Sequence, residues 1–343
     1  MTVPLKQTIG IDVAKHELVV SLARMNPNLG VEVFAGKTFT NTNKGFNDLV
    51  SWVTKLTSDQ SKAHYIMEAT GVYHEPLAYY LSNHHLPVSI VLPNKISNYS
   101  RTLDVKTVTD KTASQAIARF GVVHQLENWK QPKSVFRSLR QLTRERDQIV
   151  AERTLLKNQL HAEGTEAYPN DRSISRINMR IALLNNQEAE IKSEIAELVK
   201  QDKELVKHID TITSIPGVGK LTAITVLAET NGFELIKSKK QLVSYAGLDV
   251  REKTSGTSVK GKPKISKKGN RHLRKAMHMP ALAAIRSDEH MKAVFVRLLS
   301  RHGIKMKAAV AIQRKLLELI YILWRKNECY DKNYLLMDLP ENS

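Results

Sequence analysis

Hydrophobic and polar positions follow three different patterns along this chain of 343 residues. Up to about residue 125, short apolar runs separated by turn residues predict β-strands interleaved with helices. Between residues 130 and 202, apolar residues recur every three or four positions over long stretches, which predicts two long helices. From residue 205 to 343 the helical stripes are shorter, and this region is predicted to be mostly α-helical. The pattern therefore predicts three domains, at 1–125, 130–202 and 205–343.

The first domain is predicted to be an α/β fold built on a sheet. Strands are predicted at residues 9–13, 17–23, 31–38, 64–68 and 87–92, and helices at about 43–53 and 75–83. The first strand is rich in β-branched residues, and Asn43 is a suitable N-cap for the first helix. The predicted order is three strands, a helix, a strand, a helix, a strand and then further helices. This is the succession of an RNase H-like or RuvC-like fold.

Two of the predicted strands end in an acid, Asp12 on the first and Glu68 on the fourth. Burying a carboxylate costs several kcal/mol unless it is paired or binds a metal. In the predicted fold these strands are neighbours, so their carboxylates would converge and repel unless a divalent cation lies between them. Asp110 begins a helix that runs to Phe120 and offers a third carboxylate, for which Asp104 is a possible substitute. Two simpler roles stay open: Asp12 could cap its strand, and Asp110 could interact with the helix dipole.

The second domain is predicted to be a helical hairpin with a coiled-coil seam. The first helix carries one apolar face at Leu139, Leu142, Ile149 and Leu156. The second helix has apolar residues in an alternating four-three spacing, at Ile177, Ile181, Leu184, Ile191, Ile195 and Leu198. Only Glu188 interrupts this seam. Such a seam can be buried within the hairpin or can join two chains, and the sequence leaves both alternatives open.

Charge indicates a nucleic-acid partner. Lys and Arg total 52 against 34 acids, a net charge of +18, and cations of this number suit the phosphates of DNA or RNA, although a merely basic protein would share the surplus. Eight basic residues and no acid lie between residues 260 and 275: Lys260, Lys262, Lys264, Lys267, Lys268, Arg271, Arg274 and Lys275. Because this run lies between structured segments, we interpret it as a loop that binds the nucleic-acid backbone.

Composition also excludes several classes of protein. Cys329 is the one cysteine, so a disulfide framework or a cysteine-rich zinc site is not possible. The N-terminus lacks the layout of a signal peptide. The most apolar late segment, residues 308–324, contains charged residues such as Arg314 and Glu318 and is not expected to span a membrane. We therefore expect a cytoplasmic protein with no membrane partner.

Hydroxyl side chains cluster just before the basic run, in Lys-Thr-Ser-Gly-Thr-Ser at 253–258. Hydroxyls beside cations can bind phosphate groups. One of them could instead be a nucleophile that attacks phosphorus, if a base, a metal or nearby cations activate it.

Taken together, these motifs resemble the insertion-sequence "one-ten" family of transposases. The N-terminal motifs Gly-Ile-Asp-Val-Ala-Lys around Asp12, Glu-Ala-Thr-Gly-Val-Tyr from Glu68 and Thr-Asp-Lys around Asp110 resemble the family's DEDD nuclease domain. Ser-Ile-Pro-Gly-Val-Gly from Ser214, Tyr-Ala-Gly-Leu, Ser-Gly-Thr-Ser from Ser255 and the run from residue 266 to 274 resemble its C-terminal transposase domain. The resemblance covers nearly the whole chain in the right order.

The resemblance implies a DNA recombinase that cuts and rejoins strands through a covalent serine–DNA intermediate. It implies Mg²⁺ held by Asp12, Glu68 and Asp110, and Ser255 as the nucleophile, with Ser258 and Ser266 as alternatives. It further implies a structured guide RNA, called bridge RNA, that pairs with donor and target DNA. Assembly as a homodimer or a dimer of dimers, and a bacterial, nucleoid-associated location, are expected on the same basis.

One position departs from the family's pattern. The family expects a fourth acid three residues after Asp110, and Ala113 stands there. Acids at this spacing share one helix face, so both would have faced the metal. We expect this chain to fold, dimerise and bind nucleic acid, yet to cleave DNA slowly or not at all. Two other functions stay open: a RuvC-like junction nuclease that needs no serine, and a non-catalytic nucleic-acid-binding protein.

Overall fold

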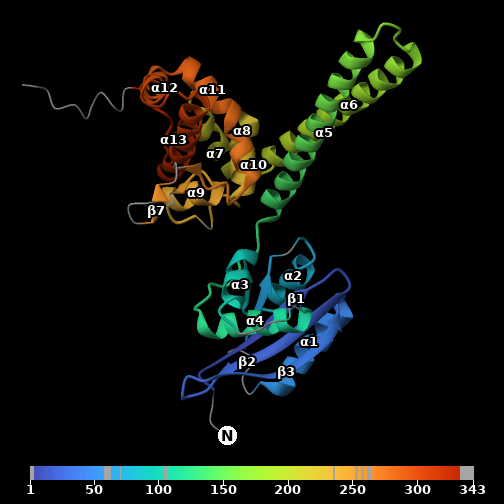
Figure 1. Cartoon of the computed structure of the whole chain (residues 1–343), viewed down its shortest axis with the longest axis vertical. Coiled ribbons are helices and arrows are strands. Elements are labelled where there is room, and N and C mark those ends of the chain that lie inside the picture. Colours follow the sequence, from blue (N-terminus) through green and yellow to red (C-terminus); the bar gives the residue numbers. More distant parts are fainter. Residues whose placement is uncertain are drawn as a thin grey trace, which may run out of the picture. The chain divides into compact units, whose positions relative to one another are not determined.

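The computed structural model describes residues 4–57, 63–69, 71–103, 107, 109–234, 236–251, 254–255, 259–260 and 264–332. The chain forms two compact units, residues 1–131 and 132–343 (Figure 1). Each unit has its own hydrophobic core. No helix within the described residues is both long and apolar enough to cross a membrane.

The first unit is built on a five-stranded sheet in the order β3-β2-β1-β4-β5. Its strands are β1 (Lys6–Val13), β2 (Glu17–Met25), β3 (Val31–Thr40), β4 (Ala63–Glu68) and β5 (Val88–Val91). The first three are antiparallel, whereas β4 and β5 run parallel to β1. Its helices are α1 (Asn43–Leu56), α2 (Glu75–Asn83), α3 (Pro93–Ser100) and α4 (Asp110–Val123). This succession and strand order confirm the RNase H/RuvC-like α/β fold expected from the sequence.

Helices cover both faces of the sheet, which is why its central strands read as continuous apolar runs. Ile9 and Ile11 of β1 point to the face on which Phe46 of α1 and Leu77 of α2 pack. The alternate residues point to the opposite face, where α3 and α4 form a second layer (Figure 1). Asp12 and Glu68 lie on this second face, because each is two residues beyond a residue that contacts α4.

The second unit is mostly helical, as the sequence predicts. Its helices are α5 (Ser134–Thr165), α6 (Asp171–Lys200), α7 (Lys203–Thr213), α8 (Lys220–Glu229), α9 (Lys239–Ala246), α10 (Arg271–Ala276), α11 (His278–Ser287), α12 (Glu289–His302) and α13 (Lys305–Lys326). Four two-residue strands, which the sequence did not predict, lie between α9 and α10: β6 (Val250–Arg251), β7 (Thr254–Ser255), β8 (Val259–Lys260) and β9 (Lys264–Ile265). They pair as β6 with β9 and β7 with β8.

The helical hairpin of α5 and α6 buries its seam within one chain (Figure 1). Leu139 and Leu156 of α5 and Ile177 and Ile195 of α6 are each less than a tenth exposed. Of the two alternatives that the spacing left open, the structure therefore shows the intramolecular seam, which needs no second copy for its burial.

Glu188, which interrupts the seam, is a buried and fully paired charge. Its carboxylate accepts hydrogen bonds from Arg153 and forms ion pairs with Arg146 and Lys192, both at 2.9 Å. Burial alone would raise the pKa of Glu188, but the hydrogen bonds from Lys192 and Arg153 and the charge of Arg146 outweigh it and lower the pKa to about 2. The polar break in the seam is thus satisfied by the facing helix.

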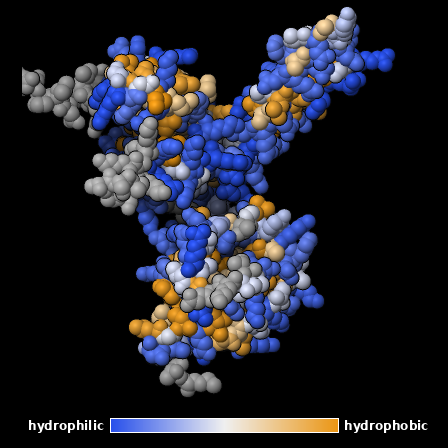
Figure 2. Space-filling view, viewed as in Figure 1, coloured by the Kyte–Doolittle hydropathy of each residue, from blue (hydrophilic) through white to orange (hydrophobic). Residues whose placement is uncertain are grey.

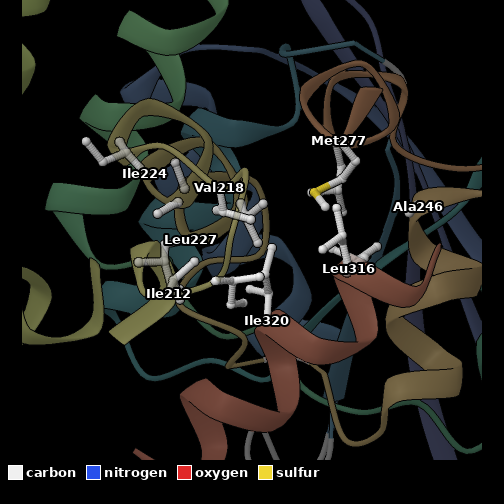
Figure 3. Packing of buried hydrophobic residues seen from close by; sticks show 14 of the residues in the cluster. Ile212, Val218, Ile224, Leu227, Ala246, Met277, Leu316 and Ile320 are labelled. Carbon is white, nitrogen blue, oxygen red and sulfur yellow. The ribbon is translucent and has the colours of Figure 1, made fainter. Parts of the chain in front are cut away.

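The rest of the second unit packs around α13. Leu316 of α13 extends toward Met277, and Ile320 lies near Ile212 of α7 and Val218 (Figure 3). Leu316, Ile320, Ile212 and Met277 are all fully buried. This core joins α7, α8, α11 and α13 into one body that supports the short strands.

Candidate active site and nucleic-acid interface

The ends of β1 and β4 bring two carboxylates together. In the parallel ladder Gly10 lies opposite Ile66 and Ile11 opposite Met67, so Asp12 and Glu68 follow as the next pair. Both carboxylates lie at the carboxyl ends of adjacent parallel strands and on the face covered by α4. Asp110, the first residue of α4, comes to the same end of the sheet.

Gly10 is what allows α4 to lie this close to β1. A Cβ atom at residue 10 would lie 2.2 Å from the backbone nitrogen of Ala118 and 2.4 Å from the carbonyl oxygen of Ser114, so no larger residue fits. Thr8 Oγ1 donates a hydrogen bond of 2.8 Å to the Ala118 carbonyl, which fixes the crossing. Gly10, which interrupts an otherwise β-branched strand, therefore determines how closely the backbone of α4 packs against β1 near Asp12.

The three acids are electrostatically coupled. The pKa of Asp12 is raised to about 6, first by burial and then by the negative charges of Asp110 and Glu68; a hydrogen bond from the Val13 backbone opposes the shift. Among the described residues, however, no three acidic, histidine or cysteine side chains are gathered as tightly as the ligands of one metal ion.

The N-terminus of α4 is fixed by a capping box. Thr109 Oγ1 accepts a hydrogen bond from the Thr112 backbone at 3.2 Å, and Thr112 Oγ1 accepts one from the Thr109 backbone at 2.8 Å. Asp110 is exposed in the first turn, where the helix dipole favours a negative charge. Ala113 is half-buried one turn later, and Asp104 lies outside the described residues.

A cavity of about 650 Å³ opens beside Glu68 and Ala113. Its other walls come mainly from α3 and the turn after it, including Asn94, Ser97 and Arg101. Amide, hydroxyl and guanidinium groups can hydrogen-bond phosphate oxygens. Glu68 therefore adjoins a mainly apolar recess with a few polar groups, large enough for part of a nucleic-acid strand.

Asn41, which the sequence did not single out, ties the two acid-bearing strand ends together. Its Nδ2 donates hydrogen bonds to the carbonyl oxygens of Ala14 (2.9 Å) and Tyr73 (3.1 Å). Ala14 follows Asp12 by two residues, and Tyr73 lies in the turn after Glu68. One asparagine at the end of β3 gives no pattern that would reveal this role.

In the second unit, Ser255 lies in a short hairpin. Its backbone is in β7 and pairs with Val259 of β8, while its side chain, like all of Ser258, lies outside what the structure describes. Ser266 has a structural role: its Oγ donates to Asp249 Oδ1 at 2.5 Å, and its backbone N–H donates to the Asp249 carbonyl at 2.8 Å. With the pairing of β6 and β9, this contact closes the base of the hairpin.

The predicted basic segment divides into exposed and anchored residues. Lys264, Lys267, Lys268 and Arg271 are exposed. Lys275 forms an ion pair of 3.2 Å with Asp147 of α5, and Arg274 donates to the carbonyl oxygens of Ala246 and Gly269. The side chain of Lys260 and the whole of Lys262 lie outside the described residues. Four cations of the segment are thus open to a phosphate backbone.

A buried carboxylate, Glu229 of α8, holds this segment in place. Arg144 of α5 donates two hydrogen bonds to it, at 2.7 and 2.8 Å, and Asn270 donates a third at 2.6 Å. Burial alone would raise the pKa of Glu229, but these hydrogen bonds lower it. Asn270 also caps α10 by accepting from the backbone of His272 and Leu273. The network fixes the start of α10, and with it the end of the exposed basic run.

Comparisons with known proteins match both units, and the first family match extends from the first unit into α5. Residues 9–169 match the model of the DEDD domain of IS110 elements, described as "Transposase", and residues 209–295 match that of the "Transposase IS116/IS110/IS902 family". The chain is 32% identical over 333 residues to the pilin gene-inverting protein of Moraxella bovis, covering 95% of this chain and 98% of that protein. It is 24% identical to the transposase for insertion sequence element IS1111A of Coxiella burnetii, covering 71% and 73%. The RuvC structure of Thermus thermophilus aligns with a TM-score of 0.28 and 10% identity, over 36% of this chain and 99% of that one.

Proposed function

The chain belongs to the IS110 family of transposases, and we propose that it cuts and rejoins DNA through a covalent serine–DNA intermediate and an acidic Mg²⁺ site. Its general class is that of a DNA transposase or recombinase. Relatives are named for transposition and for gene inversion, and both reactions require strands to be cut and rejoined. The observation that carries the proposal is the convergence of Asp12, Glu68 and Asp110 at one end of the sheet.

These three carboxylates suit a divalent cation such as Mg²⁺, which prefers oxygen ligands. The raised pKa of Asp12 supports this assignment, because burial and, after it, the neighbouring charges of Asp110 and Glu68 disfavour its charged form, and a cation would offset both. When bound, the ion would neutralise charge on the scissile phosphate and assist ionisation of the attacking hydroxyl. Asn41 would hold the two strand ends at a fixed spacing, and Arg101 would contact the strand in the adjoining recess.

Ser255 would supply the nucleophile. Its Oγ would attack the scissile phosphorus, forming an oxygen–phosphorus bond to serine while the bond from phosphorus to one deoxyribose oxygen breaks. The serine proton passes to a base, and the released oxygen takes up a proton. Attack by the hydroxyl of another strand on the same phosphorus would restore a phosphodiester and free the serine. The exposed cations of the basic segment would neutralise the strand near Ser255, and the acids would come from the same chain or from a second copy.

Trapping of covalent protein–DNA adducts tests this assignment. The assay uses the chain carrying Ala113→Asp, so that its acids match the family's pattern. Ser255→Ala should abolish adducts, whereas Ser266→Ala, which removes a contact to Asp249 at the hairpin base but leaves the Ser255 hydroxyl, should lower their yield without abolishing them. Adducts that persist in Ser255→Ala, or that vanish in Ser258→Ala instead, would overturn the assignment of Ser255.

A structured guide RNA is the second part of the proposal. Most of the net charge of +18 lies in the second unit, and it exceeds what one short DNA site requires. RNA would be recognised through its shape and 2′-hydroxyl groups. Sequencing of RNA that copurifies with the protein should return one defined transcript. Unchanged DNA recombination by nuclease-treated protein would contradict this part.

Ala113 favours a second candidate function, that of a nucleic-acid-binding protein without cleavage activity. A missing ligand leaves the fold intact but weakens the hold on metal. Binding without any Mg²⁺-dependent cleavage, by the chain as it stands and by its Ala113→Asp variant, would support this candidate over the first.

A further inference from the structure

A second group of cations projects from the turn that joins α12 to α13. All residues from 301 to 307 are exposed, and they include Arg301, His302, Lys305 and Lys307. Arg297, one turn earlier on α12, is exposed as well. No aspartate or glutamate occurs between residues 290 and 317. We call Arg297, Arg301, Lys305 and Lys307 the α12–α13 basic tip.

The members of this tip lie close enough to affect one another. Partial desolvation and the charges of Lys307 and Arg301 lower the pKa of His302. Gly303 ends α12 in the left-handed conformation (φ 67°), and a Cβ atom placed there would meet nothing within 4 Å. The turn therefore extends into open space rather than against the body of the unit.

The tip is separate from the basic segment before α10. The segment leads into α10, which packs against α8 and α9, whereas α12 packs against α11 and α13. Figure 1 shows α12 at the edge of its unit, and Figure 2 shows hydrophilic and hydrophobic residues together on the visible face there. Two cationic surfaces thus occupy different parts of one body.

Two of the tip's cations, Lys305 and Lys307, are unfavourable for the helix that bears them, whereas Arg301 in the last turn of α12 is favourable. Helices α4, α6, α7 and α12 each begin with a side-chain cap and an acid in the first turn. Helix α13, like α3, α5, α8 and α11, begins with neither a side-chain cap nor an acid, and its first turn carries Lys305 and Lys307. Positive charge at a helix N-terminus opposes the dipole. Lys305 and Lys307 therefore do not stabilise the start of α13.

We propose that the α12–α13 basic tip binds the sugar–phosphate backbone of a nucleic-acid segment other than the one bound by the basic segment at 260–275. The inference rests on the proposed function, because it takes nucleic acid as the partner. Four exposed cations in a stretch of sequence that contains no acid from residue 290 to 317 complement a phosphate backbone. Ile304 and Met306, each 58% exposed, would pack against sugar faces between the phosphates. A recombinase must hold more than one strand segment, and a second surface meets that need.

Salt-dependent binding tests the proposal. The variant is Lys305→Ala/Lys307→Ala, and the matched control is Arg325→Ala/Lys326→Ala at the other end of the same helix, about 30 Å away. Nuclease-treated full-length proteins are titrated with mixed-sequence DNA and RNA duplexes over a series of KCl concentrations. On DNA, the slope of log affinity against log salt should fall by about 0.9 for each lost phosphate contact, or about 1.8 in the variant. The control should keep the parent slope.

Three further readouts make the result decisive. The variant should melt at the parent temperature or slightly higher, because removing cations from the start of α13 relieves the dipole. A parent-like slope for the variant on both duplexes would overturn the inference, and so would loss of binding to phosphatidylserine vesicles with duplex binding unchanged. The pair Lys264→Ala/Lys268→Ala tests the basic segment separately. If the Lys264→Ala/Lys268→Ala variant keeps the parent salt slope while the tip variant has a lower one, the result contradicts the backbone-binding role of the basic segment in the proposed function. The inference about the tip then stands.

Discussion

The two units hold their candidate site residues on different kinds of scaffold. In the first, Asp12 and Glu68 lie at the ends of central strands, so the hydrogen-bonded ladder sets their spacing. In the second, Ser255 and the exposed lysines lie on short strands and loops, so side-chain contacts such as Ser266 with Asp249 and Asn270 with Glu229 hold them. A site on a sheet depends on backbone geometry and steric fit, whereas a site on a loop depends on a few buried polar contacts.

Gly10→Ala is expected to have the largest effect and to break the sheet-based site. The added methyl group would meet backbone atoms of α4, which cannot move aside as a flexible side chain could. We expect a loss of about 3 kcal/mol or more in the free energy of unfolding of the first unit. Denaturant titration measures it. Gly164→Ala in α5 is the matched control, because nothing lies within 4 Å of a Cβ there and alanine favours helix. Equal stability of the two variants would contradict the close crossing of α4 over β1.

Ala113→Asp is expected to be next in size and to complete the sheet-based site. Partners in the outer shell of a metal site already contribute about 10–100-fold to affinity or activity, so a direct ligand should contribute at least as much. Mg²⁺-dependent strand exchange should therefore rise by about a hundredfold over the chain as it stands. Adding Asp12→Ala should remove the gain. Equal activity of the parent chain and the Ala113→Asp variant would mean that a fourth acid is dispensable or that Asp104 supplies it.

Glu229→Gln tests the loop-based site. The change removes the charge that Arg144 and Asn270 bind, and Arg144 stays half-buried with a weaker partner. Because the arginine is partly exposed, we expect a loss of only about 2 kcal/mol in unfolding free energy, below the value for fully buried pairs. Affinity for duplex DNA should fall with it. Glu190→Gln, at an exposed position of α6, should change neither quantity. Parent-like DNA affinity in Glu229→Gln would show that the network does not position the basic segment.

The pH dependence of stability is the smallest expected effect and concerns the sheet-based site alone. The pKa of Asp12 in the folded chain, about 6, lies above its ordinary value of 3.8. The folded state therefore holds its proton more tightly, and stability falls as pH rises from about 4 through 6. After allowance for partial exposure, the loss is about 1 kcal/mol. Denaturant titrations across this range, with Asp12→Asn as the flat reference, measure it, and added Mg²⁺ should reduce it. A rise in stability over this window relative to Asp12→Asn would contradict the coupling of the three acids.

The same contrast explains what the sequence could reveal. The first fold and the meeting of Asp12 with Glu68 follow from local apolar runs and from the adjacency of the first and fourth strands. The packing partner of Gly10 could not be predicted, because its contact with Ala118 spans more than a hundred residues. Asn41 and Glu229 were missed for a related reason: each acts through partners distant in the sequence, and one isolated polar residue forms no pattern.

The buried charge in the α5–α6 hairpin limits how this protein can diverge. Glu188 has Arg146 and Arg153 as partners on the opposite helix. Replacing Glu188 alone would leave two arginines facing an apolar seam, and replacing either arginine would leave a carboxylate short of a partner. Relatives that differ at one of these positions should therefore differ at the others too. Among homologous chains, the residues at these three positions should covary. The seam residues on either side should vary among apolar types independently of these three positions.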